Sequence, residues 1–528
     1  MLILYNARLQ TMAPHSPIAS ALAIEGETIL AVGSDADILA LADRHTVKRD
    51  MLGKIIWPGL TDAHIHLEHY ALSLQLVNCE TTTRAECIRR VAERANLVQT
   101  GQWIRGHGWN QNNWPEGFGS ASQIDEVTGD HPAYLTAKSL HAGWANSAAL
   151  RQAGISASTP DPEGGKLLRD ANGQPTGILL ESAMNLVENC IPQLTDEDAR
   201  QMLLTAQAAL WRLGITGVHD YDSIRCFTAL QLLEKADQLH LRVVKGIPYE
   251  ALPHAVAVGL RSGFGSAYLR IGSVKLFADG ALGPQTAAMF QPYEGSPENT
   301  GFLLLDSEQV FEAGQKAAQN GLSLAIHAIG DRANHEVLNG YAHLRQYETE
   351  QRLPHLRHRI EHAQILHPDD LQRLAQLGVI ASVQPIHATS DMFMADRFWG
   401  NRSAGAYAFH TLLSSNTALA FGSDAPVEQP NPFLGIHAAV TRQRPDGQPA
   451  QDGWYPAQRL SLMEALAGFT TGPAFAAGLE NRLGQLAPGF YADLTVFETD
   501  PFSLPSSDLF AVQPIATMVG GRWVWETT

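Results

Sequence analysis

The stretch Trp57-Pro-Gly-Leu-Thr-Asp-Ala-His-Ile-His-Leu67 is an apolar segment that ends in two histidines separated by one residue. Side chains alternate between the two faces of a strand, so residues i and i+2 point the same way. We therefore expect His64 and His66 to aim two imidazoles at one point beyond a strand end. Two neutral imidazoles that converge suit a zinc-like ion. For this pair alone, two histidines without a metal remain the competing interpretation.

The composition is that of a large globular protein. Of the 528 residues, 45% are hydrophobic and 17% are charged, which is enough apolar material for a sizeable core. The net charge of -17 and the lack of a basic run argue against a nucleic-acid partner. The four cysteines have no CxxC spacing, which favours reduced thiols in a cytoplasmic protein. No signal-peptide pattern or membrane-length apolar run is found, so we expect no membrane partner. A homo-oligomer is compatible with these features.

Both ends of the chain consist of short apolar segments separated by turns, which is typical of strands. These segments are residues 2–5, 18–24, 27–33 and 54–57 near the start and 489–497 and 515–525 near the end. The last of them contains a tight Gly-Gly turn. We expect residues 1–58 and 478–528 to form one small β-sandwich domain.

The centre of the chain alternates short apolar strands with helical stretches, which predicts a parallel sheet or barrel. The candidate strands are residues 57–61, 215–218, 241–247, 271–277, 323–326, 358–361, 379–383 and 418–421, with helices at 196–213 and 306–320 among the connections. Eight parallel strands would close a (β/α)8 TIM-like barrel over residues 59–477. About 150 residues separate the first two strands, far more than an ordinary connection. We expect residues 71–205 to be an inserted lid subdomain.

Residues that can bind a metal recur at the ends of these strands. His64 and His66 follow the first strand, Lys275 lies in the fourth, His327 and His362 end the fifth and sixth, and Asp424 follows the eighth. Barrel enzymes take their catalytic residues from the ends of several strands at one face. A buried histidine or aspartate needs a partner, and one metal centre would serve all of them. Separately satisfied core residues are the alternative.

Further motifs accompany the first histidine pair. They are Gly108-Trp-Asn-Gln-Asn-Asn-Trp-Pro-Glu116, His141-Ala-Gly-Trp-Ala-Asn-Ser147, Lys275-Leu-Phe-Ala-Asp-Gly-Ala-Leu-Gly283, Gln384-Pro-Ile-His-Ala-Thr-Ser-Asp-Met392 and Leu486-Ala-Pro-Gly-Phe-Tyr-Ala-Asp493. Together they resemble the amidohydrolase superfamily and, within it, the amidohydrolase-3 group, the YtcJ-like branch that includes N-substituted formamide deformylases. The resemblance covers nearly the whole chain.

The resemblance implies a binuclear metal site. His64 and His66, with Asp424, would hold the more buried metal, and His327 and His362 would hold the second. Lys275 would bridge both as N6-carboxylysine, because a carbamate offers two oxygens whereas an ammonium cannot ligate a cation. We expect two zinc ions per chain, with manganese, iron or cobalt as alternatives. An unmodified Lys275 in a single-metal enzyme is the competing interpretation.

The reaction implied is hydrolysis of a non-peptide carbon–nitrogen bond in a small molecule, a linear N-substituted amide or formamide. Metal-activated hydroxide would attack the carbonyl, with the catalytic Asp424 as general base and then general acid. A cyclic amidase and a mononuclear aminohydrolase, or deaminase, use related sites and are alternatives. A non-enzymatic regulatory protein on the same fold is the alternative from another class.

Four residues are predicted to contact the substrate. His141, Trp144 and Asn146 lie in the insertion, and we expect them to reach the pocket from the lid. The alternative is that Trp144 packs in the core of the insertion. His219 ends the second strand and either lines the pocket or forms a structural hydrogen-bonded pair. Asp391 is interpreted, with Arg397, as part of a polar loop network.

Overall fold

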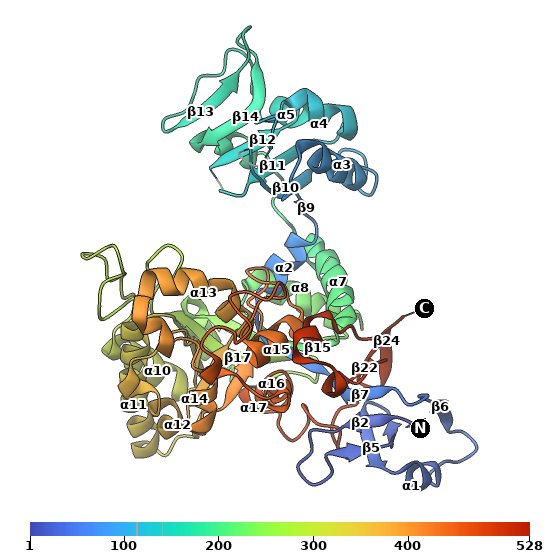
Figure 1. The fold of residues 1–528 in the computed structure, drawn as a ribbon. Coiled ribbons are helices and arrows are strands. Elements are labelled where there is room, and N and C mark those ends of the chain that lie inside the picture. Colours follow the sequence, from blue (N-terminus) through green and yellow to red (C-terminus); the bar gives the residue numbers. More distant parts are fainter. Residues whose placement is uncertain (112–113, 140, 528) are drawn as a thin grey trace. The chain divides into compact units, whose positions relative to one another are not determined.

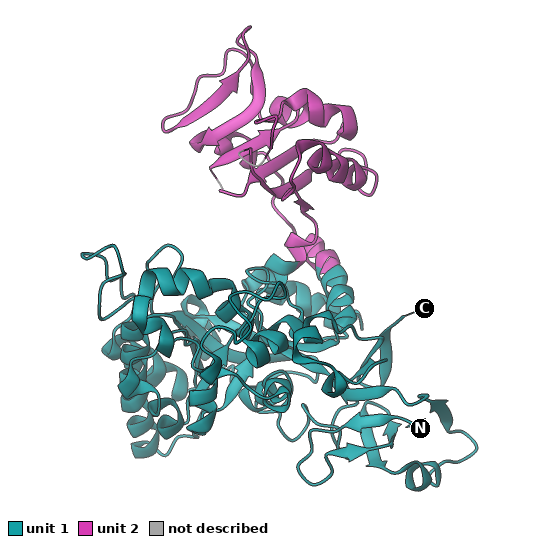
Figure 2. Ribbon diagram, viewed as in Figure 1, with its two compact units in different colours: residues 1–70, 203–528 teal, residues 71–202 magenta. Residues whose placement is uncertain are grey.

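The computed structural model describes residues 1–111, 114–139 and 141–527 of the chain. It divides the chain into two compact units, shown in different colours in Figure 2. Unit 1 comprises residues 1–70 and 203–528, and unit 2 comprises residues 71–202. Each unit has its own hydrophobic core. None of the described helices is both long and apolar enough to cross a membrane.

Unit 1 is built around a parallel eight-stranded sheet whose strands follow one another in chain order (Figure 1). The strands are β8 (Leu60–Ile65), β15 (Ile215–Asp220), β16 (Arg242–Pro248), β17 (Leu269–Phe277), β18 (Leu324–Ala328), β19 (Arg359–His362), β20 (Ile380–Val383) and β21 (Leu419–Phe421). A parallel bridge between Ile65 and Ala425 joins β8 to the segment after β21 and brings the sheet to near closure. The predicted (β/α)8 TIM-like barrel is confirmed.

Helices connect the barrel strands. They are α7 (Asp196–Arg212), α8 (Ile224–Lys235), α9 (Leu252–Ala257), α10 (Ser307–Ala318), α11 (Asp331–Glu350), α12 (Arg373–Leu377), α13 (Pro385–Trp399) and α14 (Phe409–Ser414), followed by α15 (Pro432–Thr441), α16 (Leu462–Gly468) and α17 (Thr471–Ala476). Local sequence sets their ends. At α10, for example, Asp306 and Gln309 form a reciprocal capping box that satisfies free backbone N–H groups. The helices predicted at 196–213 and 306–320 correspond to α7 and α10.

The first predicted barrel strand, residues 57–61, is wrong in its bounds. The structure divides it at Gly59 into β7 (Ile55–Pro58), which belongs to another sheet, and β8 of the barrel. A side chain at Gly59 would place its Cβ 2.2 Å from Thr216 Oγ1, so this close approach requires glycine. The break was missed because both pieces are apolar and buried. His64 consequently lies inside β8, and His66 follows it directly.

Both chain ends contribute to a β-sandwich in unit 1. One sheet has the order β5 (Thr28–Gly33), β4 (Ala21–Glu25), β1 (Leu2–Tyr5) and β6 (Val47–Asp50), and the other has β24 (Arg522–Glu526), β23 (Ala516–Val519), β22 (Leu494–Phe497), β7, β2 (Arg8–Gln10) and β3 (Ile18–Ala19). Leu4 and Leu22 of the first sheet share a core with Ile56 and Val496 of the second. The predicted segment 18–24 is split between β3 and β4.

Unit 2 is the large insertion expected after the first barrel strand. Its six-stranded sheet has the order β13 (Gly165–Arg169), β14 (Pro175–Glu181), β12 (Ala142–Ala145), β11 (Ala133–Ala137), β10 (Ile104–Trp109) and β9 (Val77–Asn78). The helices α3 (Arg84–Ala95), α4 (Ala121–Thr128), α5 (Ser147–Gln152) and α6 (Asn185–Glu188) accompany it. That this unit acts as a lid stays a prediction.

A buried ion pair joins the barrel to the β-sandwich within unit 1. Arg242, the first residue of β16, contacts Asp493 through two bonds, Nε to Oδ2 at 2.6 Å and Nη2 to Oδ1 at 2.9 Å. Each side chain is only 4% exposed. The Gly520 N–H also donates to Asp493 Oδ1. Removing one member of such a pair leaves an uncompensated buried charge, which is costly.

We therefore expect Asp493→Asn to lower the free energy of unfolding by about 3–5 kcal/mol, because the Arg242 guanidinium stays buried without its counter-charge. Asp508→Asn, at an exposed position in the short 3-10 helix Ser506–Ala511, is the matched control and should change stability by less than about 0.5 kcal/mol. The measurement is the first cooperative transition in urea, followed by circular dichroism. Identical transitions for the two variants would contradict this role of the pair.

Candidate metal centre

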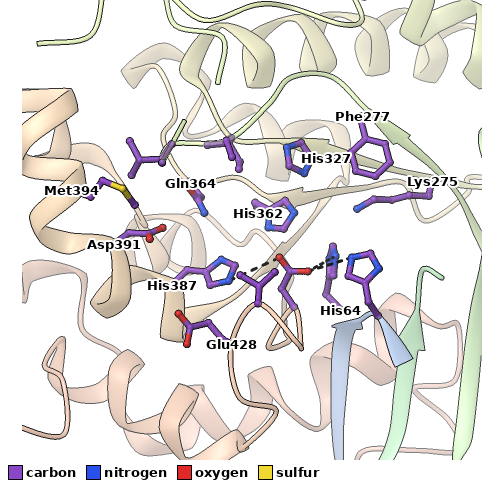
Figure 3. A pocket seen from close by; sticks show the side chains of 17 residues that line it. His64, Lys275, Phe277, His327, His362, Gln364, His387, Asp391, Met394 and Glu428 are labelled. Atoms are coloured by element: carbon purple, nitrogen blue, oxygen red, sulfur yellow. Dashed lines mark ion pairs between the residues drawn. The ribbon is translucent and has the colours of Figure 1, made fainter. Parts of the chain in front are cut away.

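A cavity of about 340 Å³ lies at the carboxyl-terminal ends of the barrel strands. All six residues predicted as metal ligands line it, and Figure 3 shows several of them pointing into it. They are His64, His66, Lys275, His327, His362 and Asp424. They come from β8, β17, β18, β19 and the segment after β21. Residues that are up to 360 positions apart in the chain thus meet at one face of the barrel, as their places at strand ends predicted.

His64 and His66 lie beside Asp424. The Nε2 atom of each imidazole is 3.4 Å from Asp424 Oδ1, as expected for two residues on the same side of a strand end. The backbone N–H of Asp424 donates to the His64 carbonyl at 2.7 Å. Asp424 has φ 60° and His362 has φ 74°, a region that non-glycine residues rarely adopt. Such backbone strain concentrates at functional sites.

Each of the four histidines has one ring nitrogen next to a hydrogen-bond acceptor. An acceptor of this kind orients the ring, fixes its tautomer and leaves the other nitrogen for a metal. The contacts are His64 Nδ1 to Glu361 Oε2 at 2.6 Å, His66 Nδ1 to Asp222 Oδ1 at 3.0 Å, His327 Nε2 to Gly280 O at 2.8 Å and His362 Nδ1 to Gln384 Oε1 at 2.8 Å.

Among these acceptors, Glu361 is fixed by contacts with two further side chains. It is fully buried, its Oε1 lies 2.5 Å from Arg359 Nε, and it accepts a hydrogen bond from the Tyr221 hydroxyl at 3.0 Å. Burial would raise the pKa of Glu361, but Arg359 and His64 bring it well below its usual value. Glu361 therefore stays a carboxylate and accepts from His64. Sequence reasoning missed it, although a carboxylate in the wholly buried strand β19 was a usable signal.

Burial sets the protonation of most of the centre. It lowers the pKa of His64 and His327 to about 4, so both rings are neutral, the form that ligates metals. At His66, burial opposes the effect of Asp222 and Asp424, which together raise the pKa to about 9. Desolvation also lowers the pKa of Lys275 to about 8, so about a tenth of its amine is neutral at pH 7.

His387 is a further residue of the centre that sequence reasoning did not select. It lies on α13, is buried, and has no hydrogen-bond partner for either ring nitrogen within the described part of the chain. Its Nε2 is 4.0 Å from Asp424 Oδ2. A buried imidazole without partners is costly, so the site is built for a group that the protein itself does not supply. Burial keeps His64, His327 and His362 neutral, the form that ligates zinc-like ions, and His66 would release its proton on binding, so these residues fit a divalent metal.

Asp391 was interpreted as part of a loop network, and this is corrected by the structure. It lies on α13, lines the cavity, and accepts a hydrogen bond from the Tyr407 hydroxyl at 2.6 Å. Pro385 occupies the first turn of α13, where a missing N–H costs nothing.

The predicted substrate contact His219 is not brought to the cavity. It is buried below the centre, where Arg359 Nη1 donates to its Nδ1 at 2.9 Å. The reason is the alternation of side chains along β15, which turns His219 toward β19 within the barrel. Its pairing partner is thus Arg359, and the structure gives His219 a packing role.

Trp144 and Asn146 are buried in the interior of unit 2. Trp144 packs against Trp109 and Trp114, and its indole N–H donates to the Ser120 carbonyl. Asn146 caps α5 by accepting from the Ala149 N–H. These contacts match the alternative in which the tryptophans form the core of the insertion. His141 is exposed and contacts Glu181 at 2.9 Å, and its contact with substrate stays a prediction.

Comparison with known proteins supports the assignment that this geometry suggests. Over 99% of this chain and 91% of the other, the sequence is 33% identical to the protein LONG AFTER FAR-RED 3 of Arabidopsis thaliana. It is 28% identical to an N-substituted formamide deformylase of Arthrobacter pascens, over 100% of this chain and 98% of the other. The crystal structure of an uncharacterized metal-dependent hydrolase from Pyrococcus furiosus superposes with a TM-score of 0.77 at 29% identity, covering 95% of this chain and 100% of that one.

The model of the amidohydrolase family matches residues 49–525, which include the barrel and every predicted ligand. The resemblance seen in the sequence motifs is thereby confirmed. The chain belongs to the amidohydrolase family of hydrolytic enzymes.

Proposed function

We propose that this protein is a metal-dependent hydrolase that cleaves the carbon–nitrogen bond of a linear N-substituted amide or formamide. The observation that carries the proposal is the convergence of four individually oriented histidines on Asp424 and Lys275 in one cavity. The formamide class is supported by the full-length similarity to an N-substituted formamide deformylase.

The residues fit two divalent ions. His64, His66 and Asp424 would hold one, and His327 and His362 would hold the second. When bound, such ions lower the pKa of a coordinated water toward 7 and polarise the carbonyl of the substrate. Zinc suits this ligand set best.

Lys275 would contribute to both ions as a carboxylated amine. Its Nζ lies 4.7 Å from the centre of the Tyr221 ring and 5.1 Å from that of Phe277. Burial lowers the pKa of Lys275 to about 8 and outweighs these two rings and the carboxylates of Glu361 and Asp424, which favour the charged form. The pKa of about 8 therefore favours reaction of the neutral amine with carbon dioxide.

Asp424 is the residue to which we assign the proton transfers. Burial raises its pKa, but His64, His66 and His362 lower it well below the usual range, so it is ionised at neutral pH. Its Oδ1 faces the two histidines of β8, and its Oδ2 faces His387 across the cavity. A carboxylate in this position can take a proton from the attacking water and return it to the leaving nitrogen. General acid–base catalysis of this kind raises the reaction rate by about 100- to 10,000-fold.

Gln384 provides a test of how His362 is oriented. Gln384→Met removes the acceptor for His362 Nδ1 and should weaken the affinity of the second metal by about 10- to 100-fold. Gln384→Glu keeps an acceptor of the same shape and should retain metal. Because the Gln384 Nε2 has no partner among the described residues, neither variant breaks another contact of that atom. Competition with a chelator measures both affinities, and equal affinities would contradict the orienting role.

The proposed reaction is tested by hydrolysis of a panel of N-alkylformamides, linear acetamides, cyclic amides and amino-heterocycles. We expect formamides to give the highest kcat/KM, with release of formate. We expect Asp424→Asn to lower kcat by about 100- to 10,000-fold, because the proton acceptor is lost.

Two outcomes would contradict the proposal. A preference for cyclic amides would identify a cyclic amidase, and a preference for amino-heterocycles would identify a deaminase. If the Asp424→Asn variant keeps both its metal and its full kcat, Asp424 does not transfer the proton. The exposed variant His343→Gln, on the outside of α11, is the control and should match the unaltered protein.

A further inference from the structure

The cavity carries two carboxylates that the proposed metal centre does not use. Asp391 of α13 and Glu428, in the segment after β21, line the same cavity as the predicted ligands. Figure 3 shows both on the opposite side of the cavity from Lys275, with His387 beside them. We call Asp391 and Glu428 the acidic subsite.

The two carboxylates of the acidic subsite have no ion-paired cation among the described residues. Asp391 accepts a hydrogen bond from the neutral Tyr407 hydroxyl, and no ion pair of Asp391 or Glu428 occurs within the part of the chain that the structure describes. Lys275, on the far side, is the only lysine or arginine among the described residues that line the cavity. Burial raises the pKa of Glu428, and so does the nearby Asp391, whereas the Ser390 hydroxyl, His387 and Arg444 lower it. Arg444 acts on Glu428 without forming an ion pair with it, and its guanidinium donates instead to the carbonyls of Thr389 and Ser390. Two carboxylates without an ion-paired cation favour a ligand that brings one.

Of the two ring nitrogens of His387, Nε2 lies 4.0 Å from Asp424 and within reach of the metal centre, which leaves Nδ1 for a further ligand. The side chain is 8% exposed and lies beside Asp391 and Glu428 in the cavity, and its Nδ1 lacks a hydrogen-bond partner among the described residues. Buried polar groups are almost always hydrogen-bonded, so an unpartnered imidazole marks the position of a polar group on the bound molecule.

The cavity wall near the acidic subsite is apolar. Met394, one turn from Asp391 on α13, and Val427, next to Glu428, both line the cavity. Aliphatic surface of this kind suits a short methylene chain. The cavity thus offers ligands for a reacting group at one end and two carboxylates at the other, with an apolar wall near them.

We propose that the acidic subsite binds a cation, so that the substrate is an amide whose substituent ends in an ammonium or guanidinium group. The identity of the reacting bond rests on the proposed function. The subsite itself rests on Asp391, Glu428 and His387 and can be tested without catalysis. Opposite charges at hydrogen-bond distance in a partly desolvated site give strong, directional recognition.

Binding of two unreactive probes tests the subsite alone. Butylguanidinium and butylurea have the same shape and differ in charge, and the guanidinium has no lone pair available for a metal. Isothermal titration of protein purified without chelator should show at least tenfold tighter binding of butylguanidinium. In the double variant Asp391→Asn, Glu428→Gln this ratio should fall to near one. Glu308→Gln, exposed at the start of α10, is the matched control and should keep the ratio.

Hydrolysis tests the inference and the proposed function together. N-(4-aminobutyl)formamide and N-pentylformamide have chains of equal length, and only the first ends in a cation. We expect kcat/KM to be at least tenfold higher for the cationic substrate, and the double variant should make the two substrates equivalent.

The outcomes of these experiments distinguish failure of the cation-binding subsite from failure of the proposed amide hydrolysis. Equal binding of butylguanidinium and butylurea to the unaltered protein overturns the subsite, and this result does not depend on any variant folding. Preferential binding of the cation without hydrolysis of either formamide supports the subsite and contradicts the proposed function. Loss of metal from Asp391→Asn or Glu428→Gln would make that carboxylate a metal ligand and would also overturn the subsite.

Discussion

The candidate site depends on the near closure of the parallel sheet, because its central residues come from opposite ends of that sheet. His64 belongs to β8, whereas Asp424 follows β21, the last strand. The bridge between Ile65 and Ala425 and the hydrogen bond from the Asp424 N–H to the His64 carbonyl join these ends. An open sheet would leave the histidine pair without its carboxylate. The fold is therefore a direct condition for the chemistry.

Burial has opposite consequences for the basic and the acidic groups of this centre. It keeps His64 and His327 neutral and lowers the pKa of Lys275, which prepares these nitrogens for metal binding or carboxylation. Glu361 and Asp424 remain ionised only because cationic or imidazole neighbours offset the same desolvation. The ligands, their acceptors and the buried Arg359 beneath them thus form one electrostatic unit, in which no member keeps its properties alone.

Much of the fold and of the candidate site could be predicted from the sequence. The alternation of strands and helices and the polar residues at strand ends predicted the barrel and gathered the residues that line the cavity. The predictions that were wrong concern features that tertiary contacts determine. The division at Gly59 reflects the approach of Thr216, and the burial of Asn146 reflects a helix cap. His387 and Asp391 were missed as cavity residues because they lie on α13, where no strand-end rule applies.

The central claim is that the gathered side chains hold two metal ions, and metal content per chain tests it most directly. Elemental analysis of protein purified without chelator should give about two equivalents, as binuclear hydrolytic sites require. His64→Asn should lose at least one of them, whereas the exposed variant His343→Gln should keep both. About one equivalent in the unaltered protein would contradict the binuclear account and favour an unmodified Lys275. No metal, with no uptake on reconstitution, would contradict metal-dependent hydrolysis altogether.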